Sequence, residues 1–184
     1  MSTHKHVCPV SLAGGLDNWV RRLVHRPEKI LSPFLEEGMT AVDYGCGPGY
    51  FTIPMARMVG PAGRVIAADL QQGMLDLVAA KAAKHGLSGR IIPHLCSGDA
   101  KIAEKADFAL LFYVAHEVPD VAALFADFAA FMKRGGKVLF VEPPFFHVAW
   151  KEFQAELELA KAAGFTASER LHMGPDRGVV LTRN

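Results

Sequence analysis

From about Thr40 onward, short apolar runs alternate with segments of helical periodicity. A short apolar run bounded by glycine or polar residues indicates a buried strand, and apolar residues recurring at helical spacing indicate a helix. The runs that predict strands are Thr40–Tyr44, Arg64–Asp69, Arg90–Cys96, Asp107–Tyr113, Lys137–Glu142, Phe165–His172 and Gly178–Thr182. The segments that predict helices are Phe51–Val59, Met74–Lys84, Val121–Met132, which we expect to end at Gly135-Gly136, and Lys151–Ala163. Strands that alternate with helices predict an α/β fold with a largely parallel sheet.

The first part of the chain lacks this alternation. We predict a helical extension or lid over residues 1–38 and a main domain over residues 39–184. Within the extension, Leu12–Phe34 carries several basic side chains and predicts one or two short helices. Such helices either pack on the domain with a solvated face or cover a substrate pocket.

Composition narrows the class of protein. With 51% hydrophobic and 21% charged residues, the 184-residue chain is typical of a globular protein. A net charge of +1 gives no attraction for nucleic acid, and no apolar run approaches the ~18 residues that a membrane span needs. The cysteines Cys8, Cys46 and Cys96 are few and odd in number, which favours reduced thiols. We expect a cytoplasmic monomer or homodimer whose partner is a small molecule, not a nucleic acid or a membrane.

The first predicted strand runs into the loop Asp43-Tyr44-Gly45-Cys46-Gly47-Pro48-Gly49. Alternate glycines let a backbone turn sharply and approach a ligand, and the helix that follows presents free N–H groups. Dinucleotide-binding enzymes favour the pattern G-x-G-x-x-G, whereas this loop has an acidic residue followed by G-x-G-x-G. The spacing therefore disfavours a dinucleotide.

Further residues follow the next two strands, where a sheet of this kind binds ligands. Asp69 ends the second strand, and its carboxylate could accept both hydroxyls of a ribose. Gly98-Asp99-Ala100 follows the third strand and could bind an adenine, although a turn aspartate is the plain alternative. Leu70 and Met74 could enclose the adenine ring or could belong to the core.

Together, the Asp43–Gly49 loop, Asp69, Gly98-Asp99-Ala100 and Lys133–Lys137 resemble the motifs of class I S-adenosylmethionine (SAM)-dependent methyltransferases. The resemblance covers roughly residues 28–183 and implies a three-layer Rossmann-like sheet of seven strands, mostly parallel, whose last strand is antiparallel. It also implies that SAM is the cofactor and S-adenosylhomocysteine its product. In it the Gly45 and Gly47 region holds the methionine part, Asp69 the ribose and Asp99 the adenine. The full set of expected cofactor contacts is Asp43, Tyr44, Gly45, Cys46, Gly47, Gly49, Phe51, Asp69, Leu70, Met74, Gly98, Asp99, Ala100 and Tyr113.

Methyl transfer from a sulfonium is an in-line displacement that needs positioning of the acceptor and, for some acceptors, a base. After the fourth strand, His116 is the first candidate for a base because its ordinary pKa lies near neutrality, and Glu117 could orient it. His147, after the fifth strand, is the second candidate. Either histidine could instead be structural. We predict no metal, although His4, His6 and Cys8 are residue types that bind one.

The sequence therefore predicts a SAM-dependent methyltransferase that modifies O, N, S or C of a small molecule. Two alternatives stay open at this point. One is a non-catalytic protein that binds SAM or a partner and has no working substrate site. The other is an NAD(P)-binding oxidoreductase, which the glycine spacing disfavours.

Overall fold

The computed structural model describes residues 25–96, 101–143, 148–173 and 176–184. The chain divides into two compact units, one spanning Cys8–Gly98 and one containing Asp99–Asn184. We call them the amino-terminal unit and the carboxy-terminal unit and describe each by itself. Within the described residues, no helix combines the length and the apolar character that crossing a membrane requires. The predicted lid lies mostly outside the described residues, so it stays a prediction.

Three parallel strands form the sheet of the amino-terminal unit. Its elements are α3 (Pro27–Leu31), β1 (Thr40–Tyr44), α4 (Thr52–Met58), β2 (Arg64–Asp69), α5 (Gln72–Lys84) and β3 (Ile91–Leu95). The central strand, β2, pairs with β1 on one side and with β3 on the other. Tyr44 lies beside Ala68 and Leu95 beside Asp69, so the three strands end at the same edge of this sheet.

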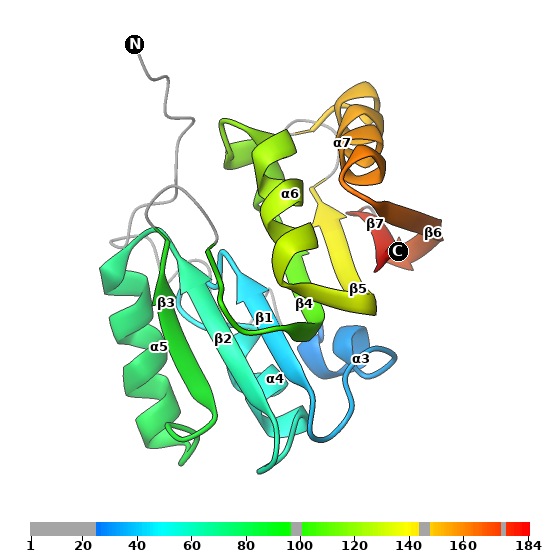
Figure 1. Ribbon diagram of the computed structural model, residues 1–184. Coiled ribbons are helices and arrows are strands. Elements are labelled where there is room, and N and C mark those ends of the chain that lie inside the picture. The colour runs from blue at the N-terminus through cyan, green and yellow to red at the C-terminus, as the bar shows by residue number, and fades with distance from the viewer. Residues whose placement is uncertain (1–24, 97–100, 144–147, 174–175) are drawn as a thin grey trace. The chain divides into compact units, whose positions relative to one another are not determined.

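Helices α4 and α5 both contact β2 and also contact each other, so they cover the same face of these strands (Figure 1). The side chains of Met55, Ile66 and Met74, one from each of α4, β2 and α5, are almost fully buried. These three side chains therefore belong to the core between the helix layer and the sheet.

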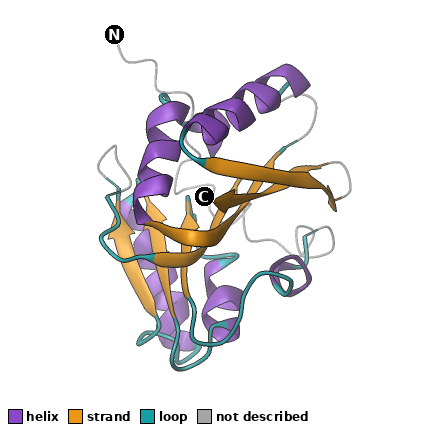
Figure 2. Ribbon diagram, turned by 45° about the vertical axis from the view of Figure 1, so that its right-hand side comes forward, coloured by secondary structure: helices purple, strands orange, loops and turns teal. Residues whose placement is uncertain are grey.

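Four strands form the sheet of the carboxy-terminal unit. Its elements are β4 (Ala106–Phe112), the short 3-10 helix η2 (Ala115–Glu117), α6 (Val121–Phe131), β5 (Met132–Glu142), α7 (Trp150–Ala162), β6 (Phe165–Met173) and β7 (Asp176–Arg183). Strand β5 runs parallel to β4, whereas β7 is antiparallel to both β5 and β6 (Figure 2). The antiparallel last strand that the family resemblance implied is therefore confirmed.

Aromatic rings fill the core of this unit. Phe125 of α6 meets Phe140 of β5 with ring centroids 5.6 Å apart, and Phe140 in turn stacks on Phe153 of α7 at 5.3 Å. All three rings are fully buried. Each such side chain removes a large apolar area from water, so these contacts hold α6 and α7 on the strand that carries Glu142 at its end.

Strand β5 begins earlier than the sequence pattern predicts. The structure starts it at Met132, directly after α6, whereas Gly135-Gly136 was expected to separate the helix from a strand beginning at Lys137. Ala106 pairs with Met132 and Phe108 with Lys137, so an irregularity in β5 takes up the extra residues. Gly135 has a φ of 76°, and a Cβ at Gly136 would lie 2.8 Å from the Lys133 carbonyl oxygen. The two glycines therefore permit a bulge within the strand.

Candidate active site

The loop after β1 depends on glycine at three positions. Gly45, Gly47 and Gly49 have φ angles of 72°, 50° and 85°, a region that other residues adopt only at a cost. A Cβ at Gly49 would also lie 3.1 Å from Cγ2 of Val78 in α5. The alternate glycine spacing is therefore required by the backbone path of the loop and by its closeness to α5.

Hydrogen bonds fasten this loop to β2 and α4. The N–H groups of Gly45 and Cys46 both donate to the carbonyl oxygen of Ala68, at 2.8 and 3.0 Å. Asp43, at the end of β1, accepts a hydrogen bond of 2.5 Å from the Thr52 hydroxyl at the start of α4. Both side chains of this pair are buried. Asp43 thus ties β1 to α4, a role in the fold that its predicted role toward the cofactor did not include.

Asp69 binds the backbone of the loop. Its Oδ2 accepts from the N–H of Gly47 and its Oδ1 from the N–H of Gln71, both at 2.9 Å. The side chain is only 8% exposed, and burial raises the pKa of Asp69, while hydrogen bonds from Gln71, Gly47 and Leu70 lower it in part. The carboxylate has about four acceptor positions, so these three N–H groups leave at least one position for a ribose hydroxyl.

The other predicted cofactor residues of this unit differ in exposure. Leu70, next to Asp69, is 53% exposed, whereas Met74 is buried in the core. Phe51 and Cys46 are also buried, and Tyr44 is half-buried. Leu70 is therefore better placed than Met74 to touch a ligand. Gly98, Asp99 and Ala100 lie outside the described residues, so their predicted role stays a prediction.

The environment of Cys46 disfavours the reactive thiolate form of its side chain. Burial raises its pKa, and the charges of Asp43 and Asp69 and the nearby Cys96 raise it further. Cys46 and Cys96 are not in a disulfide. A buried thiol that holds its proton is inert. The described residues contain no cluster of three or more metal-binding side chains, and His4, His6 and Cys8 lie outside them.

The loop after β4 is built without glycine. Tyr113 follows the last residue of β4 and has a φ of 63°, the one non-glycine residue with positive φ among those described. Its N–H donates to the carbonyl oxygen of Val141, and its hydroxyl donates to Oδ1 of Asp176 at 2.6 Å. Backbone strain of this kind persists only where the surroundings enforce it and is common at functional sites.

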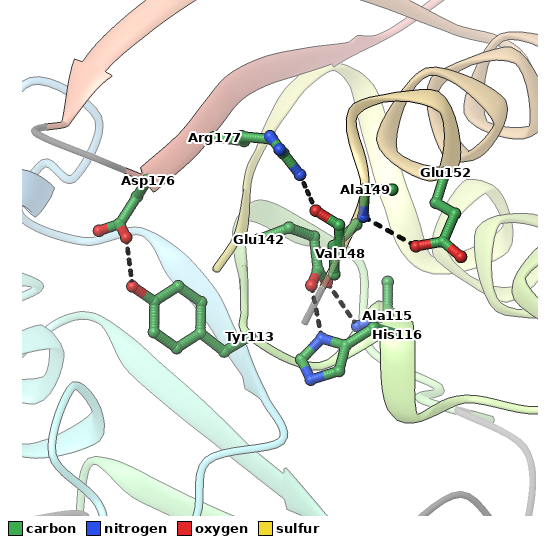
Figure 3. A network of polar contacts seen from close by, with 9 residues as sticks. All are labelled: Tyr113, Ala115, His116, Glu142, Val148, Ala149, Glu152, Asp176 and Arg177. Atoms are coloured by element: carbon green, nitrogen blue, oxygen red, sulfur yellow. Dashed lines mark hydrogen bonds and ion pairs between the residues drawn. The ribbon is translucent and has the colours of Figure 1, made fainter. Parts of the chain in front are cut away.

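His116 lies in η2 and contacts the end of β5 (Figure 3). Its Nδ1 is 2.5 Å from Oε2 of Glu142, and Oε1 of the same carboxylate accepts from the Ala115 N–H at 2.9 Å. The Glu142 side chain is fully buried. The hydrogen bond that orients His116 therefore comes from Glu142 and not, as the sequence suggested, from Glu117.

The surroundings of His116 change its acidity. Burial lowers its pKa, but the hydrogen bond and charge of Glu142 raise it, as do the charges of Glu117 and Glu156, and the net result is a pKa above its ordinary value. Glu142 belongs to β5 and Glu156 to α7. The carboxylates that raise the pKa of His116 therefore come from three elements, β5, α7 and η2, which contains Glu117.

Two residues of this network, Glu142 and Asp176, were not among the residues predicted from the sequence. Glu142 could have been found, because it ends an apolar strand just as Asp69 ends β2. Asp176 could not, because its contact with Tyr113 depends on the register of the final hairpin. His147, the second candidate base, lies outside the described residues and stays a candidate.

Comparisons with known proteins identify the family and the fold of the chain. Residues 16–173 match the family described as "Methyltransferase domain". A demethylmenaquinone methyltransferase of Lactobacillus johnsonii is 30% identical over 128 residues, which make up 65% of this chain and 52% of that protein. A nocamycin O-methyltransferase of Saccharothrix syringae is 33% identical over 103 residues, or 55% of this chain and 36% of that protein.

The chain thus spans about half or less of the length of these two relatives. The crystal structure of a SAM-dependent methyltransferase from Aquifex aeolicus is similar over 97% of this chain and 100% of that one, with a TM-score of 0.86 and 24% identity. This likeness confirms the predicted fold class, an α/β Rossmann-like fold of seven strands.

Proposed function

This chain belongs to the family of methyltransferase domains, and from that premise we propose that it is an enzyme that transfers the methyl group of SAM to a small molecule by in-line displacement. The resemblance to class I SAM-dependent methyltransferases is confirmed, and with it SAM as the cosubstrate of the family. The oxidoreductase alternative loses its support. The methyl acceptor is the part of the proposal that remains to be identified.

The observation that carries the proposal is the position of Asp69 beside the glycine loop. The carboxylate is held by the Gly47 and Gln71 N–H groups and has acceptor capacity left for a ribose hydroxyl. We propose that Asp69 holds the ribose, the Gly45 and Gly47 region the methionine part, and exposed Leu70 one face of the adenine. When bound there, SAM would supply an electrophilic methyl group.

A small-molecule acceptor agrees with two observations. The net charge of +1 offers no attraction for a polyanion. Two relatives carry the names of small-molecule methyltransferases, for demethylmenaquinone and for nocamycin. We further propose that His116 is the base for the acceptor, with His147 as the second candidate. The expected cytoplasmic location and monomeric or dimeric state remain predictions.

The first test separates SAM binding from dinucleotide binding. A ligand that binds only the folded state raises the melting temperature by mass action. We expect SAM and S-adenosylhomocysteine to raise the melting temperature of the full chain, and NAD and NADP to leave it unchanged. A shift with NAD and none with S-adenosylhomocysteine would contradict the proposal. Binding of SAM without any transfer of labelled methyl to a metabolite extract would favour the non-catalytic alternative.

A further inference from the structure

Both oxygens of the Glu142 carboxylate are engaged, one by the Ala115 N–H and one by His116. One oxygen of the carboxylate is held by the Ala115 N–H at 2.9 Å, and the other lies 2.5 Å from Nδ1 of His116. Because Glu142 is fully buried and ends β5, neither its backbone nor its side chain can turn away without losing both contacts. The imidazole ring is therefore held in one orientation (Figure 3).

This orientation determines which ring nitrogen is available. An ionised carboxylate only accepts hydrogen bonds, so with Glu142 ionised the neutral ring carries its proton on Nδ1 and its lone pair on Nε2. Nε2 lies on the side of the ring away from Glu142 (Figure 3). Within the parts of the chain that the structure describes, Nε2 makes no hydrogen bond, and the His116 side chain is 20% exposed. Of the two ring nitrogens, Nε2 is therefore the one that a ligand would meet.

The charges around His116 make it a stronger base than free imidazole and disfavour anions nearby. Glu142 of β5, Glu117 of the same short helix and Glu156 of α7 all favour its protonated form. Glu142 and Glu156 are buried, so their charges are weakly screened. The same carboxylates would repel an acceptor that carries a negative charge.

We infer that Glu142 is a positioning residue that aims Nε2 of His116 at the hydroxyl of an uncharged phenol or enol, which is the class of methyl acceptor. This inference rests on the proposed function and deepens it. A phenol, with a pKa near 10, needs a base at neutral pH, and a strengthened imidazole can supply one. A thiol ionises more easily without help, and an aliphatic alcohol is too weak an acid for a histidine. An ammonium group would be stabilised in its charged, unreactive form by the three carboxylates.

Bound SAM supplies a methyl carbon whose bond to sulfur breaks with the electron pair left on sulfur. On the acceptor, the O–H bond breaks, its proton goes to Nε2 of His116, and the oxygen keeps the pair that forms the new O–C bond. Glu142 stabilises the resulting imidazolium through Nδ1–H. The proton then leaves Nε2 for solvent, which restores the neutral ring.

The first experiment reads the histidine directly and needs no acceptor. Nuclear magnetic resonance of the 15N-labelled full chain gives the tautomer and the pKa of His116. We expect the proton on Nδ1 and a raised pKa in the parent protein, and a lowered pKa with mixed tautomers in Glu142→Gln. The control is Glu158→Gln, an exposed glutamate of α7 that should change neither value. A neutral His116 that carries its proton on Nε2 in the parent protein overturns the inference, even if Glu142→Gln does not fold.

The second experiment reads the acceptor class. The full chain is given SAM with a 13C-labelled methyl group and a mixture of catechol, 1-naphthol, salicylate, phenethylamine and thiophenol. We expect label on the oxygen of catechol or 1-naphthol, little on anionic salicylate, and a fall in kcat of roughly 100-fold in Glu142→Gln at unchanged KM for SAM. Label on nitrogen or sulfur, or no label on either neutral phenol, overturns the inference.

Binding of S-adenosylhomocysteine, measured by calorimetry on the same samples, distinguishes a wrong acceptor class from a wrong proposed function. If binding is retained while the phenols stay unlabelled, the acceptor class is wrong and the SAM site stands. If binding is absent, the proposed function itself fails.

Discussion

The loops after β1 and β4 are each held by a carboxylate from the end of the neighbouring strand. The two carboxylates differ in the groups that they bind. Asp69 of β2 accepts from two backbone N–H groups, those of Gly47 and Gln71. Glu142 of β5 accepts from one backbone N–H and from the side chain of His116. The first loop turns on three glycines with positive φ, whereas the second turns on Tyr113.

We infer that this difference separates ligand binding from catalysis. A loop made of glycine and backbone N–H groups presents a fixed surface whose groups do not titrate, which suits a ligand that must be held the same way each time. A loop whose contacts are a histidine, a tyrosine and two carboxylates contains groups that donate, accept and exchange protons. We therefore expect substitutions in the first region to change affinity or stability and substitutions in the second to change turnover.

Asp69→Ala is the strongest test of the first region. It removes the proposed ribose partner, so S-adenosylhomocysteine binding should weaken by about 1.5–3 kcal/mol, the range for hydrogen bonds to charged groups. That loss corresponds to roughly a tenfold to 150-fold rise in Kd. Isothermal titration calorimetry measures it.

The matched control for this substitution is Asp76→Ala. Asp76 is an exposed residue of α5 whose Oδ1 accepts from the Gln72 amide at 2.9 Å, so its loss should leave affinity unchanged. Equal affinities of Asp69→Ala and the parent protein would mean that Asp69 serves only the loop backbone. Asp69 would then have a structural role, and the proposed difference in function between Asp69 and Glu142 would no longer hold.

The first region could be predicted from sequence because its requirements are local. Positive φ demands glycine, and the spacing from Gly45 to Gly49 is visible without any knowledge of packing. Asp69 was a candidate because an acidic residue that ends an apolar strand lies at the edge where such sheets bind ligands, and its ribose role stays a prediction. The same locality gave the bounds of β1 and β2 to the residue.

The second region could be predicted only in part because its contacts are distant in the chain. His116 was a candidate from its place after β4, but its partner Glu142 comes from a different strand, and the nearer Glu117 was the natural expectation. The bulge that lengthens β5 was missed for a similar reason, since Gly135-Gly136 is equally typical of a loop between elements. Sequence spacing does not reveal which strands become neighbours.

Thr52→Val sharpens the comparison by removing the hydrogen bond that ties β1 to α4. Valine has nearly the same shape as threonine but lacks the hydroxyl that donates to the buried Asp43 at 2.5 Å. The free energy of unfolding should fall by about 1–3 kcal/mol, since a buried carboxylate loses a donor. Urea denaturation measures the change. Thr166→Val is the control, because its exposed hydroxyl, bonded to Asn184, should contribute less than about 0.5 kcal/mol.

The smallest expected effect is a pH dependence that belongs to the second region. The folded protein raises the pKa of His116 above its ordinary value: burial opposes this, but Glu142, Glu117 and Glu156 outweigh it. A histidine that binds its proton more tightly when folded contributes stability that is complete below the unfolded pKa of about 6.5 and is lost as pH rises through the folded pKa. The gap in unfolding free energy between the parent protein and His116→Gln should therefore shrink with rising pH across that window. Urea denaturation of both proteins at several pH values measures the gap, and in Glu142→Gln the slope should be weaker because the closest partner of the imidazolium is gone. A gap that stays constant with pH would mean that His116 is held equally well in both charge states, and its contact with Glu142 would then be structural in the same sense as the contacts of the glycine loop.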